Sequence, residues 1–145
     1  MRIKVFLDTN ILMDIVQDGR LSTDSSREIM QAIFDRKIEA VIATQSILDV
    51  SYVVQKAGII PVFFRSVGKW LDYVNMDSIS TFDVRWAMGH YSGDFEDDTL
   101  LARALDTYCD VFVTNDKKLC RHNNGKYESL QFMSPEEFVA KMKAS

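Results

Sequence analysis

The sequence predicts an α/β fold, a three-layer α/β/α sandwich around a mainly parallel central sheet of four to five strands. Short apolar runs rich in β-branched and aromatic residues occur at residues 3–7, 40–43 and 111–113. Runs of this length and composition are typical of buried parallel strands. Between them lie segments whose apolar residues recur at helical spacing, and strands that alternate with helices favour helices on both faces of the sheet.

Length and composition indicate one ordinary globular domain over residues 1–145, of which 47% are hydrophobic and 26% charged. No apolar run approaches the roughly 20 residues of a membrane span, and nothing at the N-terminus resembles a signal peptide. We therefore expect a cytoplasmic protein without membrane contact. Cys109 and Cys120 are too few for a disulfide framework, and their spacing is no zinc pattern. The net charge of −4 argues against binding nucleic acid over the whole surface, but it allows a local basic patch or an acidic site neutralised by metal ions.

Capping residues and periodicity set the expected helices. Gly58 suits the carboxyl end of one helix, and Lys37 is a cation near the carboxyl end of another. Pro61 and Pro135 fit the first turns of two more. One expected helix, at 82–91, should turn Val84, Ala87 and Met88 inward. The expected helices cover residues 11–16, 26–36, 44–58, 61–74, 82–91, 95–108 and 134 onward, and weaker strands are expected at 78–80 and 130–132.

Acidic residues follow two of the strands directly. Asp8 comes after the run at 3–7, and Asp116 comes after the run at 111–113. Because parallel strands end at one edge of a sheet, both acids are expected at the edge where open α/β sheets bind ligands. Asp49 lies early in the helix after the second strand, so it is expected near the same edge.

Asp97 is the acid that most needs an explanation, since it points along a buried helical stripe with Leu101, Ala104 and Tyr108. A carboxylate there is costly unless it is paired or binds a metal. On the same helical wheel Asp98 lies on the shoulder of that stripe and Glu96 points away from it. Asp94 precedes the helix and suits its N-cap.

Three of these acids, Asp8, Asp49 and Asp97, also have a purely structural interpretation. Asp8 is well placed to cap a helix, since Asp, Thr and Asn are all favoured there. Asp97 is compatible with hydrogen bonds from backbone amides, and Asp49 is compatible with an exposed helix face.

Taken together, the aspartates suit one or two hard cations such as Mg²⁺ or Mn²⁺, which prefer oxygen ligands. Such a cluster serves phosphoryl chemistry, with one ion activating water and a second stabilising the leaving oxygen. Thr9, Asn10, Thr114 and Asn115 are expected to orient the carboxylates or hold a phosphate, and turn or cap chemistry explains them equally well.

A basic run follows Asp116 directly. Lys117, Lys118 and Arg121 are candidate RNA contacts beside the acids, and a solvated helix face explains them as well.

The motifs quoted above resemble those of the PIN-domain ribonucleases, and in length the chain is similar to the VapC-like toxins of bacterial toxin–antitoxin pairs. The resemblance spans nearly the whole chain. It rests on Phe6-Leu7-Asp8-Thr9-Asn10, the 44–54 helix with Asp49, Asp94-Phe95-Glu96-Asp97, Val113-Thr114-Asn115-Asp116 and Ser134-Pro135-Glu136-Glu137-Phe138.

The resemblance implies a PIN-like fold and a Mg²⁺- or Mn²⁺-dependent endoribonuclease that leaves a 5′-phosphate and a 3′-hydroxyl. It maps Asp8, Asp49, Asp97 and Asp116 onto the family's catalytic, metal-binding positions, with Asn10 and Thr114 as supporting residues. It also implies a homodimer and an antitoxin protein that enters the site. The aromatic helix with Phe63, Phe64 and Trp70 is the expected dimer interface.

The main departure from the family pattern is Asp49, where the family most often has Glu. The side chain is one methylene shorter, so Glu96 and Asp98 are the substitutes if Asp49 does not reach a metal.

Two other functions remain open. A catalytically silent PIN fold would bind RNA or act as a scaffold. An aspartyl-phosphate enzyme would also place Asp after its first strand, but the phosphatases of this kind need a second Asp where this chain has Asn10.

Overall fold

The structure is a computed structural model that describes residues 2–145. A five-stranded sheet forms its centre, in the spatial order β3-β2-β1-β4-β5, and every neighbouring pair of strands is parallel. The expected α/β sandwich is therefore confirmed. The strands are β1 (Lys4–Leu7), β2 (Glu39–Ala43), β3 (Asn75–Asp77), β4 (Val111–Val113) and β5 (Gln131–Met133).

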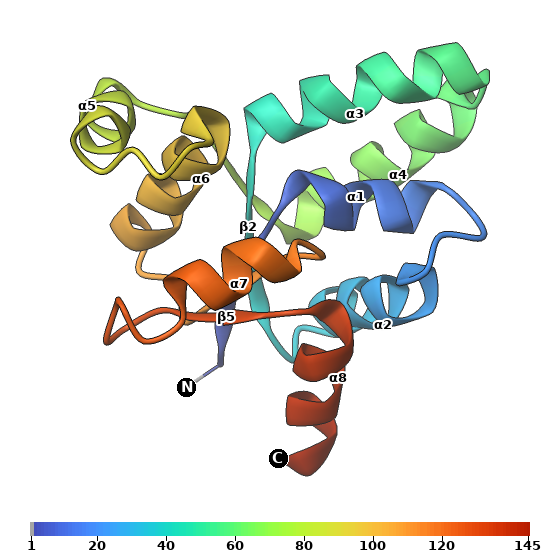
Figure 1. The fold of residues 1–145 in the computed structure, drawn as a ribbon. Helices are drawn as coiled ribbons and strands as arrows, with labels where there is room; N and C mark the ends of the chain where they lie inside the picture. The colour runs from blue at the N-terminus through green and yellow to red at the C-terminus, as the bar shows by residue number, and fades with distance from the viewer. Residues whose placement is uncertain (1) are drawn as a thin grey trace.

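Helices cover both faces of the sheet, and Figure 1 shows α5 and α6 gathered on the left, away from α1 to α4 on the right and α8 below. Within the described residues the helices are α1 (Thr9–Val16), α2 (Thr23–Phe34), α3 (Thr44–Ala57), α4 (Ile60–Tyr73), α5 (Thr81–Gly89), α6 (Phe95–Asp106), α7 (Lys117–Asn123) and α8 (Pro135–Ala144).

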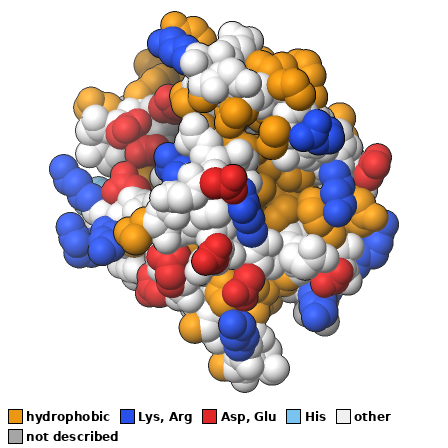
Figure 2. Space-filling view, turned by 90° about the vertical axis from the view of Figure 1, so that its right-hand side faces the viewer, with side chains coloured by type: hydrophobic (Ala, Val, Ile, Leu, Met, Phe, Trp, Pro, Cys, Tyr) orange, Lys and Arg blue, Asp and Glu red, His pale blue; other side chains and the backbone are white. Residues whose placement is uncertain are grey.

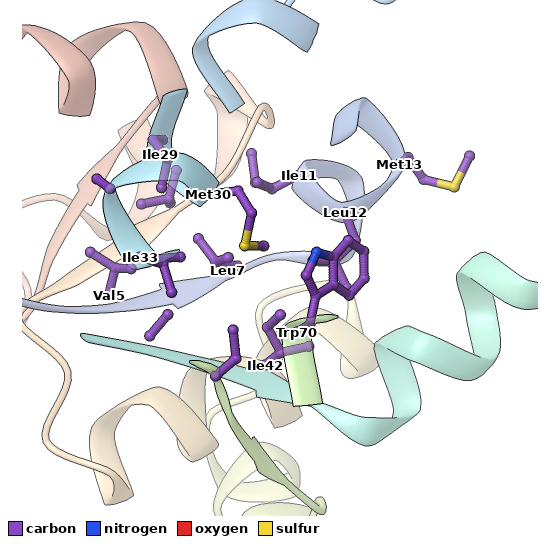
Figure 3. Close-up of a cluster of buried hydrophobic side chains, with 14 of the residues drawn as sticks. Val5, Leu7, Ile11, Leu12, Met13, Ile29, Met30, Ile33, Ile42 and Trp70 are labelled. Atoms are coloured by element: carbon purple, nitrogen blue, oxygen red, sulfur yellow. The ribbon is translucent and has the colours of Figure 1, made fainter. Parts of the chain in front are cut away.

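The alternation of side chains along each strand divides the core in two. Val5 and Leu7 of β1 face a cluster built with α1, α2, α3, α4 and α8, part of which Figure 3 shows around Trp70 of α4. Phe6 of the same strand faces the opposite cluster with Phe112 of β4 and the apolar side of α6. Burying each of these large side chains stabilises the fold by about 1.5–3 kcal/mol.

The strand order creates a switch point beside β1. From β1 the chain adds β2 and β3 on one side, and it then crosses back to add β4 and β5 on the other. The carboxyl ends of β1 and β4 are adjacent there, with Leu7 paired to Val113. Ligands of open α/β sheets bind in the crevice outside such a switch point, so the residues that follow these two strands are candidates for a functional site.

Three local expectations differ from the structure. The strand expected at 78–80 is in fact β3 at Asn75–Asp77, an edge strand of only three residues that pairs with β2 and has no apolar pattern to reveal it. Helix α5 buries Ala87, but Val84 and Met88 are exposed, because its other buried residue is the charged Asp83. The last strand lies one residue later than expected.

The aromatic residues of α4 are not all exposed, as the expected dimer interface would require. Phe63 and Trp70 are buried in the core, whereas Phe64 is 64% exposed. Only Phe64 of the three therefore lies on the surface that a partner molecule reaches.

Across residues 2–145, no helix combines the length and the apolar composition needed to span a membrane.

Candidate functional site

The polar side chains that follow β1 and β4 form a rim at the switch point. Asp8 lies at the centre of this rim and is only 4% exposed. Its Oδ1 accepts a hydrogen bond of 2.7 Å from the Thr9 amide, so Asp8 is also the N-cap of α1. Burial raises the pKa of the Asp8 carboxyl above its ordinary value, and the charges of Asp116 and Asp94 raise it further. Hydrogen bonds from Thr114 and Thr9 act in the opposite direction.

Thr114 joins the ends of β1 and β4 through its buried hydroxyl. This hydroxyl donates to Asp8 Oδ2 at 2.7 Å and accepts the backbone amide of Asp116 at 3.1 Å. The Asn10 side-chain amide completes the group, since it donates to both Thr114 Oγ1 and Asp8 Oδ2 at 3.4 Å. Asn10 and Thr114 thus hold the Asp8 carboxylate in one orientation.

Thr9 and Asn115 contact other parts of the rim. The hydroxyl of Thr9 shares a hydrogen bond of 2.7 Å with Ser46 of α3 and so links α1 to α3. The amide of Asn115 donates to Asn10 Oδ1 at 3.1 Å.

Asp116 is half-buried and caps α7, accepting the Leu119 amide at 3.1 Å. The fixed backbone of the β4–α7 turn places it beside Asp8, whose pKa its charge raises.

Asp97 completes this group from the other side of the rim. Its pKa is raised to about 7, first by burial and then by the charges of Asp8, Asp94 and Asp116. The structure therefore brings Asp8, Asp97 and Asp116 together, and Asp94 lies among them. Asp94 is the N-cap of α6 as expected, accepting the Asp97 amide at 3.0 Å. From the sequence, Asp94 was expected only to cap the helix, although its position three residues before Asp97 puts it at the same helical end.

The order of burial along α6 is the reverse of the helical-wheel expectation. Asp98 is the more buried acid, at 4% exposed, and Asp97 is half-buried. Ser92 donates to both Asp98 oxygens, from its amide at 2.8 Å and from its hydroxyl at 2.6 Å. Asp98 is thus held by the α5–α6 loop.

Asp49 lies apart from the three central acids. It is exposed on α3, and its close acidic neighbour is Glu96 of α6. The pKa of Glu96 is raised to about 7, first by a hydrogen bond with the Asp49 carboxyl, then by burial and by the charges of Asp49, Asp94 and Asp8. Glu96 therefore bridges Asp49 to the rim.

One further acid of this region is buried and was not predicted from the sequence. Asp14 of α1 is 1% exposed and accepts Arg20 Nε and Ser26 Oγ, both at 2.8 Å, and Asn115 Nδ2 at 2.5 Å. It anchors the loop that carries Asn115 to α1 and α2. Its signal in the sequence was a lone acid inside the apolar run of α1.

A cavity of about 380 Å³ opens between α6 and α7, beside the acids. Asp97 and Asp116 form part of its wall, and Lys118 lies at the same cavity. Lys117 and Arg121 are exposed on α7 as well, so all three candidate RNA contacts are accessible.

The donors of this rim match a hard divalent cation in chemistry and in charge. The close side chains are all carboxylates, and their mutual repulsion is what such an ion relieves. Within residues 2–145, however, no three of these side chains converge closely enough to form a ready-made metal site. Binding an ion therefore requires the carboxylates to draw nearer than they lie here.

Comparison with known proteins gives one family. A model of the PIN domain matches residues 4–118, which include the four acids expected at the metal site. Among curated proteins, none matches the chain by sequence.

Several solved structures have a similar fold. A toxin–antitoxin complex from Klebsiella pneumoniae has a TM-score of 0.63 and 19% identity, covering 87% of this chain and 94% of that one. VapBC2 from Rickettsia felis, bound to a DNA fragment from its promoter, has a TM-score of 0.65 and 14% identity, covering 91% and 98%. VapC20 of Mycobacterium tuberculosis, a sarcin–ricin loop cleaving toxin, has a TM-score of 0.59 and 9% identity, covering 74% and 86%. At these identities the likeness is one of fold.

Proposed function

This chain belongs to the PIN-domain family, and we propose that it is a Mg²⁺- or Mn²⁺-dependent endoribonuclease that acts as the toxin of a toxin–antitoxin pair. The observation that carries the proposal is the convergence of Asp8, Asp97 and Asp116 at the switch point of the sheet, where the charge of Asp116 raises the pKa of Asp8 and the charges of Asp8 and Asp116 raise the pKa of Asp97. Carboxylates crowded together in this way are expected of a site that works with a bound divalent ion.

We assign the binding of one or two ions to Asp8, Asp97 and Asp116. A bound ion would supply a hydroxide from water and stabilise charge on the leaving oxygen. Thr114 and Asn10 orient Asp8 through their hydrogen bonds, and this orientation sets which carboxylate oxygens remain free.

Asp49 contributes to the proposed metal site only through its pairing with Glu96. The pair lies on the outer side of the rim, where either carboxylate is available to a second ion or to a water held near the first. The longer Glu96 side chain makes up for the methylene that Asp49 lacks.

We further propose an RNA substrate and an antitoxin partner in the cytoplasm. The exposed cations Lys117, Lys118 and Arg121 follow Asp116 directly and suit the RNA backbone. Two of the structures with this fold are described as a toxin–antitoxin complex and as VapBC2, which supports a protein partner for this chain.

A homodimer is the assembly that the surface supports. Exposed apolar side chains gather on α3 and α4, among them Leu48, Tyr52, Phe64 and Leu71, each more than 60% exposed. Figure 2, which views the side where α2, α3 and α4 lie in Figure 1, shows hydrophobic side chains clustered at its upper right with cations beside them. Such a contiguous apolar patch is typical of a protein interface.

The direct test is cleavage of RNA by the purified protein with Mn²⁺, followed by sequencing of the RNA ends. We expect the wild type to leave 5′-phosphate ends. Asp8→Asn and Asp97→Asn should each cleave roughly 100-fold more slowly than the wild type, because each removes one charged ligand. Asp24→Asn, an exposed acid on α2, is the matched control and should cut normally.

The competing function is a catalytically silent PIN fold that binds RNA, and the exposed position of Asp49 favours it. In that case the wild type binds RNA without cutting it at any Mn²⁺ concentration. Cutting by Asp97→Asn at the wild-type rate would leave a nuclease but refute the assignment of Asp97.

A further inference from the structure

The cavity between α6 and α7 is lined by hydrogen-bond donors as well as by acids. Asp97 and Asp98 come from α6, and Asp116 precedes α7. Lys118 and His122 come from α7 itself. The volume of about 380 Å³ falls within the roughly 300–1,000 Å³ of ligand pockets, so the cavity holds a group much larger than one metal ion. The proposed metal site accounts for the acids, but it leaves the two nitrogen-bearing side chains of α7 without a role.

Lys118 and His122 are not paired with the acids of the same cavity. They lie four residues apart on α7, which puts them next to each other on one side of the helix, and both are exposed. Neither takes part in an ion pair within residues 2–145. The basic side chains that do so there are Arg2, Arg20, Arg27, Arg103 and Lys143. The charge of Lys118 is therefore available to a ligand.

The His122 ring is held by Lys126, whose Nζ lies 3.0 Å from His122 Nε2. An ammonium group only donates hydrogen bonds, so Nε2 accepts this one, and a neutral ring then carries its proton on Nδ1. Among residues 2–145 the Nδ1 atom has no hydrogen-bond partner of its own. His122 thus keeps one unused donor, which adds to the unused ammonium group of Lys118.

The ligand that suits these donors is an anion. Residues 117–126 contain no acid, and their five basic side chains are Lys117, Lys118, Arg121, His122 and Lys126. An RNA strand carries one phosphate per nucleotide, and phosphate oxygens accept hydrogen bonds from N–H donors. When the cleaved phosphate lies at the acids, the neighbouring phosphate of the strand is one nucleotide away. The cavity is shared by those acids and the two donors of α7, so it has a place for that neighbouring phosphate.

We propose that Lys118 and His122 form a subsite for the RNA phosphate next to the cleaved one, so that the protein prefers RNA with a phosphate flanking the cleaved bond. This inference rests on the proposed nuclease function for the position of the cleaved phosphate. Lys118 supplies a positive charge and His122 supplies a directed N–H donor. Because such contacts are made to the backbone, the subsite positions the strand beside the acids without selecting a base.

Dinucleotides with and without a flanking phosphate test the subsite. ApA has only the internal phosphate, pApA adds a 5′-phosphate and ApAp adds a 3′-phosphate. We would titrate each into ¹⁵N-labelled protein and follow the backbone amides of Gly93 and His122, which line the cavity, by NMR. Ca²⁺ is included because a divalent ion at the acids lowers their repulsion of phosphate, and chromatography afterwards verifies that the dinucleotides are intact. We expect pApA or ApAp to bind roughly tenfold more tightly than ApA.

Lys118→Met and His122→Phe should each reduce this gain to roughly threefold or less, because each removes one donor to the flanking phosphate. Both side chains are exposed, so neither change disturbs the core. Lys37→Met is the matched control and should keep the full gain. Lys37 is also an exposed cation, but it lies between α2 and β2, at the edge of the sheet opposite the acids.

Equal binding of the three dinucleotides, shifts confined to other parts of the chain, or a full gain in Lys118→Met or His122→Phe would overturn the proposal. Two outcomes separate it from the proposed function. Mn²⁺-dependent RNA cleavage with equal binding of the three dinucleotides refutes the subsite and leaves the nuclease. A gain that both variants lose, without any RNA cleavage by the wild type, refutes the nuclease and leaves a phosphate subsite on an RNA-binding protein.

Discussion

Asp97 connects the charge of the site to the stability of the fold. Its pKa in the folded protein is about 7, whereas an unfolded chain returns it to its ordinary value near 3.8. The folded state therefore holds the proton more tightly. The stability that Asp97 contributes is fully present below about pH 4 and is lost as the pH rises through 7.

Asp97→Asn should consequently stabilise the metal-free protein at about pH 8 by roughly 1–2 kcal/mol, after allowance for screening at this half-buried position. The gain should shrink as the pH is lowered from about 8 towards 4, where Asp97 in the wild type is protonated too. Thermal melts in EDTA across this range measure it.

The matched control for this stability change is Asp24→Asn, which should shift the melting temperature little at any pH because Asp24 is exposed. In Mn²⁺ the wild type should melt at a higher temperature than Asp97→Asn, since only the wild type keeps the Asp97 carboxylate as a metal ligand. A melting temperature of Asp97→Asn below that of the wild type in EDTA at about pH 8 would contradict the proposed repulsion.

Thr114 makes the second residue-scale prediction. Its hydroxyl is fully buried and serves Asp8, Asp116 and Asn10 at once. Thr114→Val keeps the shape but removes one hydrogen bond from each of these partners, so we expect a loss of about 1–3 kcal/mol in stability and roughly 10- to 100-fold in Mn²⁺ affinity. Calorimetric titration with Mn²⁺ and urea unfolding measure the two effects.

Thr114→Ser retains the hydroxyl and is the control, with Mn²⁺ affinity expected within about threefold of the wild type. Wild-type Mn²⁺ affinity in Thr114→Val would show that the hydroxyl does not position Asp8.

The sequence predicted those site residues that depend on local chain order. Asp8 and Asp116 follow buried strands, so their place at one edge of a parallel sheet follows from the strands alone. Contacts made across the fold were not predictable in this way. The burial of Asp14 depends on Asn115, which is 101 residues away, and the pairing of Asp49 with Glu96 depends on where the fold places the first turns of α3 and α6.

At the scale of elements, α5 is attached to α6 largely through charge. Asp83 is fully buried and, within α5, forms a capping box with Ser80. It also pairs with Arg103 of α6, whose Nε lies 3.2 Å from Asp83 Oδ2. Arg103 reaches Asp106 and the Ser78 carbonyl as well. Because few apolar residues of α5 are buried, this ion pair sets where the helix sits.

Removing one partner of the pair should be costly, since it leaves a buried charge alone. We expect Arg103→Met to lower the free energy of unfolding by roughly 3–5 kcal/mol. Adding Asp83→Asn to Arg103→Met should recover part of that loss, because the remaining side chain is then neutral. Urea unfolding of both single variants and the double variant gives the coupling energy.

Additive effects in that cycle would mean that Asp83 and Arg103 act independently, and the proposed attachment would then be wrong. The exposed pair Arg27–Asp18 is a suitable comparison, for which the coupling should stay below about 1 kcal/mol.

Some elements could be predicted from the sequence more accurately than others, and the buried ion pair accounts for this in α5. Strands β1, β2 and β4 can be predicted from their unbroken apolar runs, which arise because both of their faces are buried. Helix α5 has no such pattern, since its inward face carries Asp83, and Val84 and Met88 lie outside. Strand β3 is an edge strand defined only by its pairing with β2.

At the scale of the whole molecule, the order of strands and helices sufficed to predict the sandwich, whereas the assembly depends on surface that folding leaves uncovered. Phe64 and Leu71 are seven residues apart on α4, and Leu48 and Tyr52 are four apart on α3. Each spacing puts its pair on one side of a helix. The two helices pack together, and we infer that the pairs contribute to one exposed apolar face.

We expect this face to hold a homodimer in solution. Phe64→Glu and Leu71→Glu should each convert the dimer to a monomer, because a charge placed in an apolar interface must be desolvated without a partner. Light scattering coupled to size-exclusion chromatography measures the mass. Met88→Glu is the control, since Met88 is an exposed apolar residue on α5 and should leave the dimer intact. A wild type that is monomeric at all concentrations, or a Phe64→Glu variant that remains dimeric, would show that α3 and α4 serve another contact.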